Sequence, residues 1–248
     1  MKNYFILLTA LILTTLNALG QNDKQFKFKL DGTINADTGT VTLFFRTDYI
    51  PKNDSDIVAK VKNGKFSILG YLPEPQSVEI GFGDNYLTSD FIIEKGLQTI
   101  SISIDSARQV PVVSNNTMQN EYPRYTAFFK QPTIKQNICD QKYNSIYKLN
   151  NYTLPEEIRT SMTKELDILY KEHDKLLLTY AEKNPNSEIA FWTLARLMIF
   201  GYEPIFDSIY NSFSDDLKNG YAGKVLNTKL MEGKVLTVGK YFPLIPCA

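Results

Sequence analysis

Hydrophobic and polar residues alternate along the first half of the chain. Between Phe26 and Ile34, apolar side chains alternate with Lys, Asp and Thr, and successive side chains of a strand point to opposite faces of its sheet. Asn63-Gly64 separates two such runs and predicts a hairpin, because a type I′ turn needs positive φ at both central residues. Further alternating or apolar segments occur at 40–46, 57–61, 66–68, 78–82, 91–93, 99–104 and 110–113. Short strands separated by turn signals predict an antiparallel β-sandwich or barrel over residues 21–115.

A different spacing begins after Asn116, where apolar residues repeat every three or four positions. The longest such stripe predicts one amphipathic helix of about 27 residues that begins near Glu156. Thr153 and Glu156 have the spacing of a capping box, and Asn184-Pro185-Asn186 ends the pattern. The residues of the stripe are Ile158, Met162, Leu166, Leu169, His173, Leu176 and Tyr180.

The segments around this helix complete an all-helical region at 116–235. Residues 189–200 are apolar nearly all round and follow a possible cap at Asn186 or Ser187, so they predict a helix that is buried on most sides. Shorter helices are predicted at 206–213 and 219–231, whereas 116–150 is polar and only loosely helical. The expected class is therefore α+β, with an N-terminal antiparallel β-sandwich or barrel followed by helices.

The N-terminus has the features of a secretory signal peptide. Lys2 precedes an apolar run from Tyr4 to Leu16, and the small residues Ala18 and Gly20 provide a cleavage site. The run is shorter than the roughly 20 residues that span a membrane, although an uncleaved N-terminal anchor is the alternative. We expect residues 1–20 to be removed. The mature chain would then be exported to the periplasm or cell envelope, with no membrane span.

Composition narrows the classes of function. The 27 Lys and Arg residues balance 27 Asp and Glu residues, whereas a nucleic-acid-binding protein usually carries a basic excess or stripe. With 43% hydrophobic residues the chain can bury a core. A single His and two Cys exclude sites built from several histidines and cysteine-rich zinc modules. We therefore expect no metal, no cofactor and no nucleic-acid partner.

The two cysteines, Cys139 and Cys247, lie far apart in the chain. Dithiol redox enzymes use two neighbouring thiols, usually in a Cys-x-x-Cys motif at a helix start, and no such motif occurs here. In an oxidising compartment the two residues could form one long-range disulfide, or both could be unpaired, inert thiols. Dithiol redox activity is not expected in either case.

Two patterns could carry hydrolytic chemistry. His173 could act as a general base beside Glu172 or Asp174, but adjacent helical residues point about 100° apart, which favours a packing role. Ser161 and Lys164 match the Ser-x-x-Lys pattern of penicillin-recognising enzymes, but the Lys-Thr-Gly and Ser-Asp-Asn partners of that pattern are missing, and so is a Gly-x-Ser-x-Gly elbow. We expect no catalytic residue in the chain.

The remaining polar motifs have simpler interpretations. Gly81-Phe82-Gly83 lacks a third glycine that opens a helix and predicts a turn or bulge. Asn53-Asp54-Ser55-Asp56 lacks the glycine and distal glutamate of a calcium loop and predicts a solvated loop. Glu156-Glu157 and Asp215-Asp216 fit first helical turns, where carboxylates interact favourably with the helix dipole.

Several short motifs together resemble a known family. In order they are Phe28-x-Leu30-x-Gly32-x-Ile34, Lys62-Asn-Gly-Lys-Phe66-Ser-Ile-x-Gly70, Phe91-Ile-Ile-Glu94-Lys-Gly96, Pro185-x-Ser187 and Val238-Gly239-Lys240-x-x-Pro243. After a signal peptide, this order resembles the N-terminal half of exported thioredoxin-like TlpA/ResA-type disulfide reductases of Bacteroidetes, over residues 26–243. The resemblance implies a β-rich domain of unknown function (domain of unknown function 4369), a helical segment and a lead-in to a thioredoxin domain.

The sequence departs from that family at its end. Residues 236–248 resemble only a stub of the lead-in, and a thioredoxin domain would need on the order of 100 further residues. The catalytic residues of the family thus have no counterparts among the given residues.

Two functions follow as hypotheses. The first is a non-catalytic, exported accessory or interaction module that engages an unknown protein partner or client in the cell envelope. The alternative is a β-sandwich that binds a glycan or a peptide through exposed members of its 15 Phe, 15 Tyr and one Trp. A hydrolase centred on His173 or Ser161 is the least favoured interpretation.

Overall fold

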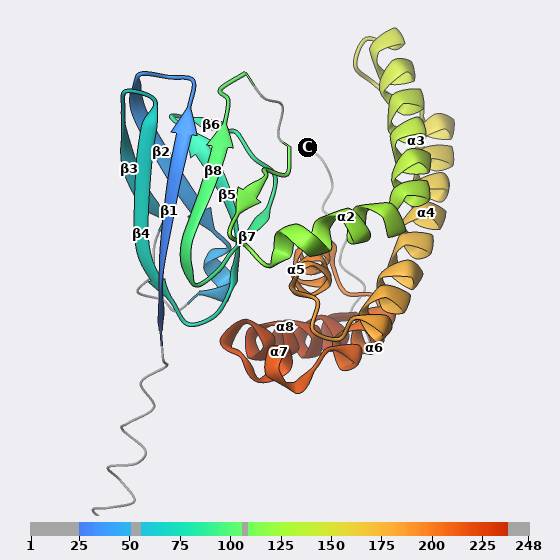
Figure 1. The fold of residues 1–248 in the computed structure, drawn as a ribbon. Coiled ribbons are helices and arrows are strands. Elements are labelled where there is room, and N and C mark those ends of the chain that lie inside the picture. Colours follow the sequence, from blue (N-terminus) through green and yellow to red (C-terminus); the bar gives the residue numbers. More distant parts are fainter. Residues whose placement is uncertain (1–24, 51–55, 106–108, 238–248) are drawn as a thin grey trace, which may run out of the picture.

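The computed structural model describes residues 25–50, 56–105 and 109–237. The predicted signal peptide and most of the lead-in stub lie outside the described residues. Within these ranges, nine strands form one curled sheet, and seven α-helices follow them in the chain (Figure 1). This arrangement confirms the α+β class, with an N-terminal sheet followed by helices.

The order of the strands across the sheet differs from their order in the chain. Its order is β6-β5-β2-β3-β4-β1-β8-β9, and β7 also pairs with β5. The strands are β1 (Phe26–Ile34), β2 (Thr38–Phe45), β3 (Ile57–Lys62), β4 (Lys65–Leu72), β5 (Gln76–Phe82), β6 (Asn85–Tyr86), β7 (Phe91–Ile93), β8 (Gly96–Ile102) and β9 (Val113–Ser114). The strands at the two ends of this order, β6 and β9, contain only two residues each.

One pair of neighbouring strands differs from the expected antiparallel arrangement. β1 and β8 are parallel, with Phe28 opposite Gly96 and Ile34 opposite Ile102, whereas the other strand pairs of the described residues are antiparallel. Six strands separate β1 from β8 in the chain, so no hairpin turn dictates their direction. Alternation along each strand predicts which face is buried but not the direction of a distant neighbour.

The inner face of the curled sheet carries the first hydrophobic core. Phe28, Leu30, Leu43 and Ile80 are fully buried there, and the residues between them in each strand face outward. The Asn63-Gly64 hairpin is confirmed, since φ is 50° at Asn63 and 70° at Gly64 and the turn joins β3 to β4. Alternation and turn chemistry therefore determine this half of the fold.

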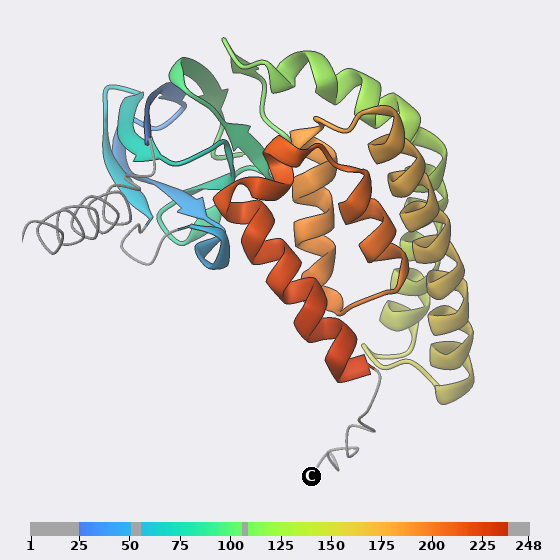
Figure 2. The ribbon, with the colours of Figure 1, turned by 90° about the horizontal axis from the view of Figure 1, so that it is seen from below.

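The helices form the second half of the molecule. They are α2 (Met118–Phe128), α3 (Lys130–Leu149), α4 (Glu156–Lys183), α5 (Glu188–Leu197), α6 (Ile205–Ser212), α7 (Asp215–Asn219) and α8 (Tyr221–Thr237). Figure 2 shows α5 in the middle, between α8 and the paired helices α3 and α4. In the described ranges, no helix combines the length and apolar character that crossing a membrane requires.

Helix α5 is the centre of the second hydrophobic core, as its apolar sequence predicts. Ser187 is its N-cap, and the Ser187 hydroxyl accepts a hydrogen bond of 3.0 Å from the Ala190 N–H. Phe191, Trp192 and Leu194 are buried among residues of α2, α4, α6 and α8. This helix faces the sheet at the site described below.

Two details of the helical half differ from expectation. Residues 118–149 form two well-defined helices, α2 and α3, rather than a loosely helical region, because packing against α4 and α5 orders a segment of weak intrinsic pattern. The predicted capping box of Thr153 and Glu156 is also wrong. The N-cap of α4 is Pro155 without a side-chain cap, and the Thr153 hydroxyl donates instead to the Asn150 carbonyl at 2.6 Å.

Candidate functional site

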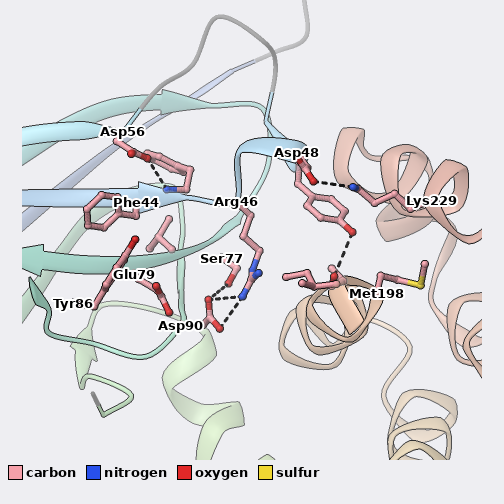
Figure 3. A pocket seen from close by; sticks show the side chains of 15 residues that line it. Phe44, Arg46, Asp48, Asp56, Ser77, Glu79, Tyr86, Asp90, Met198 and Lys229 are labelled. Atoms are coloured by element: carbon pink, nitrogen blue, oxygen red, sulfur yellow. Dashed lines mark hydrogen bonds and ion pairs between the residues drawn. The ribbon is translucent and has the colours of Figure 1, made fainter. Parts of the chain in front are cut away.

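The sheet and the helices meet at a cleft of about 610 Å³ (Figure 3). Strands β2, β5 and β6 form one wall, and helices α5 and α8 with the short 3₁₀ helices η1 (Thr47–Tyr49) and η2 (Met198–Phe200) form the other. Its volume lies in the range of small-ligand sites, about 300–1,000 Å³. We call it the junction cleft, and its lining includes Phe44, Arg46, Asp48, Tyr49, Asp56, Glu79, Tyr86, Asp90, Met198, Ile199 and Lys229.

The sheet wall of the junction cleft combines aromatic rings with carboxylates. Phe44 lies opposite Glu79 in the β2–β5 register, and its ring centroid is 4.8 Å from that of Tyr86. Asp56 stands beside them, and its Oδ1 accepts a hydrogen bond of 3.1 Å from the Phe45 N–H. Figure 3 shows these side chains along one wall of the cleft. An aromatic pair flanked by carboxylates suits a cation with an apolar stem.

The floor of the cleft is a partly buried ion-pair cluster around Asp90. Arg46 Nη2 donates to Asp90 Oδ1 and Oδ2 at 2.9 and 3.0 Å, and Arg196 Nη1 of α5 lies 3.4 Å from Oδ2. The Ser77 hydroxyl donates to Oδ1 at 3.3 Å. Asp90 therefore connects the β2 and β5 strands to helix α5. Ion pairs between partly buried groups favour one relative position of the two halves.

The helical wall is organised around Tyr49. Its hydroxyl donates to the Ala195 carbonyl at 3.4 Å, and its ring meets Trp192 edge-on at 5.6 Å. Burial, together with the nearby Asp48 charge, raises the pKa of Tyr49, so it remains a neutral donor. Lys229 Nζ of α8 pairs with Asp48 at 2.8 Å and lies 5.5 Å from the Tyr49 ring centroid. Met198 and the exposed Ile199 extend this wall with apolar surface.

A second contact joins the sheet to α8. The Glu74 carboxylate, in the β4–β5 turn, accepts a 2.9 Å hydrogen bond from the Tyr221 N–H and another from the Ala222 N–H. Glu74 thus caps the N-terminus of α8 from outside the helix, and a negative charge is favourable at a helix N-terminus. Burial and the Glu74 charge raise the pKa of the neighbouring Glu188 to about 8. These groups line a smaller cavity of about 210 Å³ beside Trp192.

The residues considered for hydrolysis do not come together. Ser161 is exposed on α4, twelve residues before His173, which corresponds to about 18 Å along the helix axis. His173 Nδ1 lies 3.8 Å from Asp174 Oδ1, beyond hydrogen-bonding distance, and the imidazole stacks on Phe129 at 4.9 Å. Glu172 points to α3, where it binds Lys135 at 2.7 Å. His173 of α4 therefore packs against Phe129, the residue that joins α2 to α3.

The other sequence motifs occupy the positions expected of them. Gly83 follows β5 in a turn with φ of 56°, and the two acidic pairs lie in the first turns of α4 and α7. Residues 53–55 of the predicted solvated loop lie outside the described residues. Among the residues that the structure describes, no three His, Cys, Asp or Glu side chains are grouped so that they could hold a metal ion.

Cys139 lies buried on α3, facing α4. Burial, followed by the charges of Glu165 and Asp140, raises the pKa of its thiol, which disfavours the reactive thiolate. Cys247 lies outside the described residues, so the possible Cys139–Cys247 disulfide remains a prediction.

We expect the Cys139 thiol to be protected in the folded protein. In a Cys247→Ser variant, alkylation by iodoacetamide at pH 7.5 should be at least tenfold slower under native conditions than in 6 M guanidinium chloride. Mass spectrometry of the alkylated peptide measures both rates. A native rate equal to the unfolded rate would contradict the burial of this thiol.

The pattern of the sequence does not predict the junction cleft. Its residues come from seven separate elements and from the segments between them, and only tertiary packing brings them together. One local signal exists, because Phe44 is a large aromatic residue at the outward position of a strand whose inward residues are Val41, Leu43 and Phe45. An aromatic side chain at a solvent-facing strand position indicates a contact or a binding surface.

A scan of protein-family models and a search of the curated proteins each found no match to the chain. The resemblance to the N-terminal half of TlpA/ResA-type reductases therefore remains a prediction.

Proposed function

We propose that the chain is a non-catalytic, exported interaction module, and that the junction cleft binds a segment of a partner polypeptide carrying a basic and an apolar side chain. One observation carries this proposal. The Phe44–Tyr86 pair and the carboxylates of Asp56 and Glu79 form one wall, and the apolar η2 surface forms the opposite wall.

The chemistry of the two walls selects this class of ligand. A Lys or Arg side chain can lay its aliphatic stem on the Phe44 and Tyr86 rings while its charged end reaches Glu79 or Asp56. An apolar side chain of the same segment can then contact Met198 and Ile199. Four carboxylates and two cations line the cleft, so a basic segment is favoured over an acidic one.

A pair of labelled peptides tests the proposal on the full chain. Fluorescence anisotropy would compare a fluorescein-labelled peptide of alternating Lys and Leu with the same peptide carrying Glu in place of Lys. We expect saturable binding of the Lys peptide only. Glu79→Lys should weaken this binding at least tenfold, because it places a like charge in the cleft.

Two further variants make the test specific. Tyr86→Ala removes the exposed ring and should also weaken binding, whereas Glu182→Lys makes the same charge change at an exposed position of α4 and should not. Thermal unfolding of each variant reports whether it is folded. Equal binding of the two peptides, or an equal loss of affinity in Glu182→Lys, would refute a specific site in the cleft.

A further inference from the structure

The outer face of the sheet carries a second hollow that shares no lining residue with the junction cleft. It is a shallow groove of about 880 Å³ across β3, β4, β1, β8 and β9. β3 and β4 lie on the side of the sheet away from the helices (Figure 1). We call it the lysine groove. Lys60, Lys62 and Lys65 lie at one end, and its floor carries hydroxyl side chains.

The register of the strands aligns these groups in two rows. In the first row, Lys62 of β3 lies opposite Lys65 of β4, Lys65 opposite Thr33 of β1, and Thr33 opposite Ser101 of β8. The second row runs through Ser67, Asp31, Thr99 and Ser114. Neighbouring strands lie about 4.8 Å apart, so the floor presents hydroxyl groups at regular intervals across four strands.

The lysine end of the groove is electrostatically unbalanced. Lys62 and Lys65 face each other directly across the β3–β4 hairpin, and like charges in this position destabilise a sheet. Within the described ranges, Lys60, Lys62 and Lys65 are all exposed and none of them makes an ion pair. An anion bound between them would relieve the repulsion, so charge complementarity specifies an anionic occupant.

The carboxylate of Asp31, which also lines the groove, does not cancel this charge. Asp31 receives a 2.7 Å hydrogen bond from Lys29 and another of 2.7 Å from the Ser67 hydroxyl. Both interactions lower the pKa of Asp31, so its charge is already matched by Lys29. The hydroxyls of Thr33 and Ser101, 3.0 Å apart, lie beyond it on the floor.

We propose that the lysine groove binds an acidic polysaccharide, with its carboxylate or sulfate groups at Lys60, Lys62 and Lys65 and its sugar hydroxyls on the Ser and Thr side chains of the floor. A row of donor and acceptor hydroxyls matches a polyhydroxylated chain. Among the described residues that line it, the groove has no exposed aromatic ring on which nucleic-acid bases could stack. Among the same lining residues, Val112 is the one exposed large apolar side chain.

Calorimetry with short oligomers tests this proposal on the full chain. The probes are a galacturonate hexamer, a heparin hexasaccharide, the neutral maltohexaose and hexaglutamate. We expect at least one acidic glycan to bind, with an affinity that falls as NaCl rises from 0.05 to 0.5 M, as expected for charge contacts, and no binding of maltohexaose. Lys62→Gln/Lys65→Gln should weaken glycan binding at least tenfold.

The controls separate this site from general electrostatic attraction. Lys164→Gln/Lys175→Gln removes the same charge from exposed positions of α4 and should leave binding unchanged. Thr99→Val removes one floor hydroxyl and should weaken glycan binding without lowering the melting temperature, because Thr99 is exposed. Binding of hexaglutamate as tight as that of the glycans, an equal loss in the α4 variant, or no binding of either acidic glycan would overturn the proposal.

Discussion

Replacing Gly223 by Ala should destabilise the protein by about 3 kcal/mol, a magnitude typical of overpacking. Alanine is the better helix former by about 1 kcal/mol, so intrinsic propensity alone predicts the opposite sign. At this position of α8, however, an added Cβ would lie 2.1 Å from the Leu217 carbonyl oxygen and 2.6 Å from that of Lys218. Backbone atoms cannot move aside as a flexible side chain can, so α8 must separate from α7.

Urea unfolding at 25 °C measures this effect, with Lys224→Ala as the matched control. Lys224 is the next residue of α8 and is exposed, so its substitution should change the free energy of unfolding by no more than about 0.5 kcal/mol. The separation of α7 from α8 should also disturb the cap that Glu74 provides at Tyr221 and Ala222. A Gly223→Ala variant as stable as the parent would show that the two helices do not approach this closely.

The β half of the fold was largely predictable because its signals are local. Alternation between Phe26 and Ile34 selects the buried face of β1, and Asn63-Gly64 determines the β3–β4 hairpin. The parallel pairing of β1 with β8 was not predictable, since the residues that pair are about 70 positions apart. Nothing in the pattern of either strand encodes the direction of its partner.

In the helical half, some helices are predicted by their sequence pattern, whereas others depend on tertiary packing. The α4 stripe and the apolar α5 sequence predict those helices directly. The α2–α3 region has a weak pattern, and its order comes from contacts such as the Tyr125 and Phe129 rings against Tyr180. Packing of this kind depends on residues distant in the chain, so a prediction from local pattern underestimates it.

Candidate sites were the least predictable part of the molecule. Composition and spacing argued against catalysis at His173, and the Phe129 contact gives that residue a packing role. Both proposed binding surfaces depend instead on which strands become neighbours. Lys62 and Lys65 are close in sequence, but the hydroxyl floor beside them exists only because β1 and β8 pair.

Replacing Glu188 by Gln should make the protein more stable at pH 9 and leave its stability nearly unchanged at pH 4. Burial, together with the Glu74 charge, raises the pKa of Glu188 from 4.5 to about 8 in the folded state. Between these two values the folded protein retains a proton that the unfolded chain has lost, so stability falls as the pH rises from about 4.5 to about 8. One pKa unit corresponds to about 1.4 kcal/mol, which makes the expected gain at pH 9 on the order of a few kcal/mol.

The gain arises because the neutral amide side chain of the variant incurs no penalty for a buried charge. Urea unfolding of the parent and of Glu188→Gln at pH 4, 6, 8 and 9 would measure it. Glu182→Gln, at an exposed position of α4, provides the control and should show no such pH dependence. Glu74→Gln removes a like charge that raises the pKa of Glu188 and should lower that pKa, so the stability of this variant should fall less steeply over the same interval. A constant difference between the parent and Glu188→Gln from pH 4 to 9 would mean that Glu188 titrates normally and that its carboxylate is solvated at the α5–α8 junction.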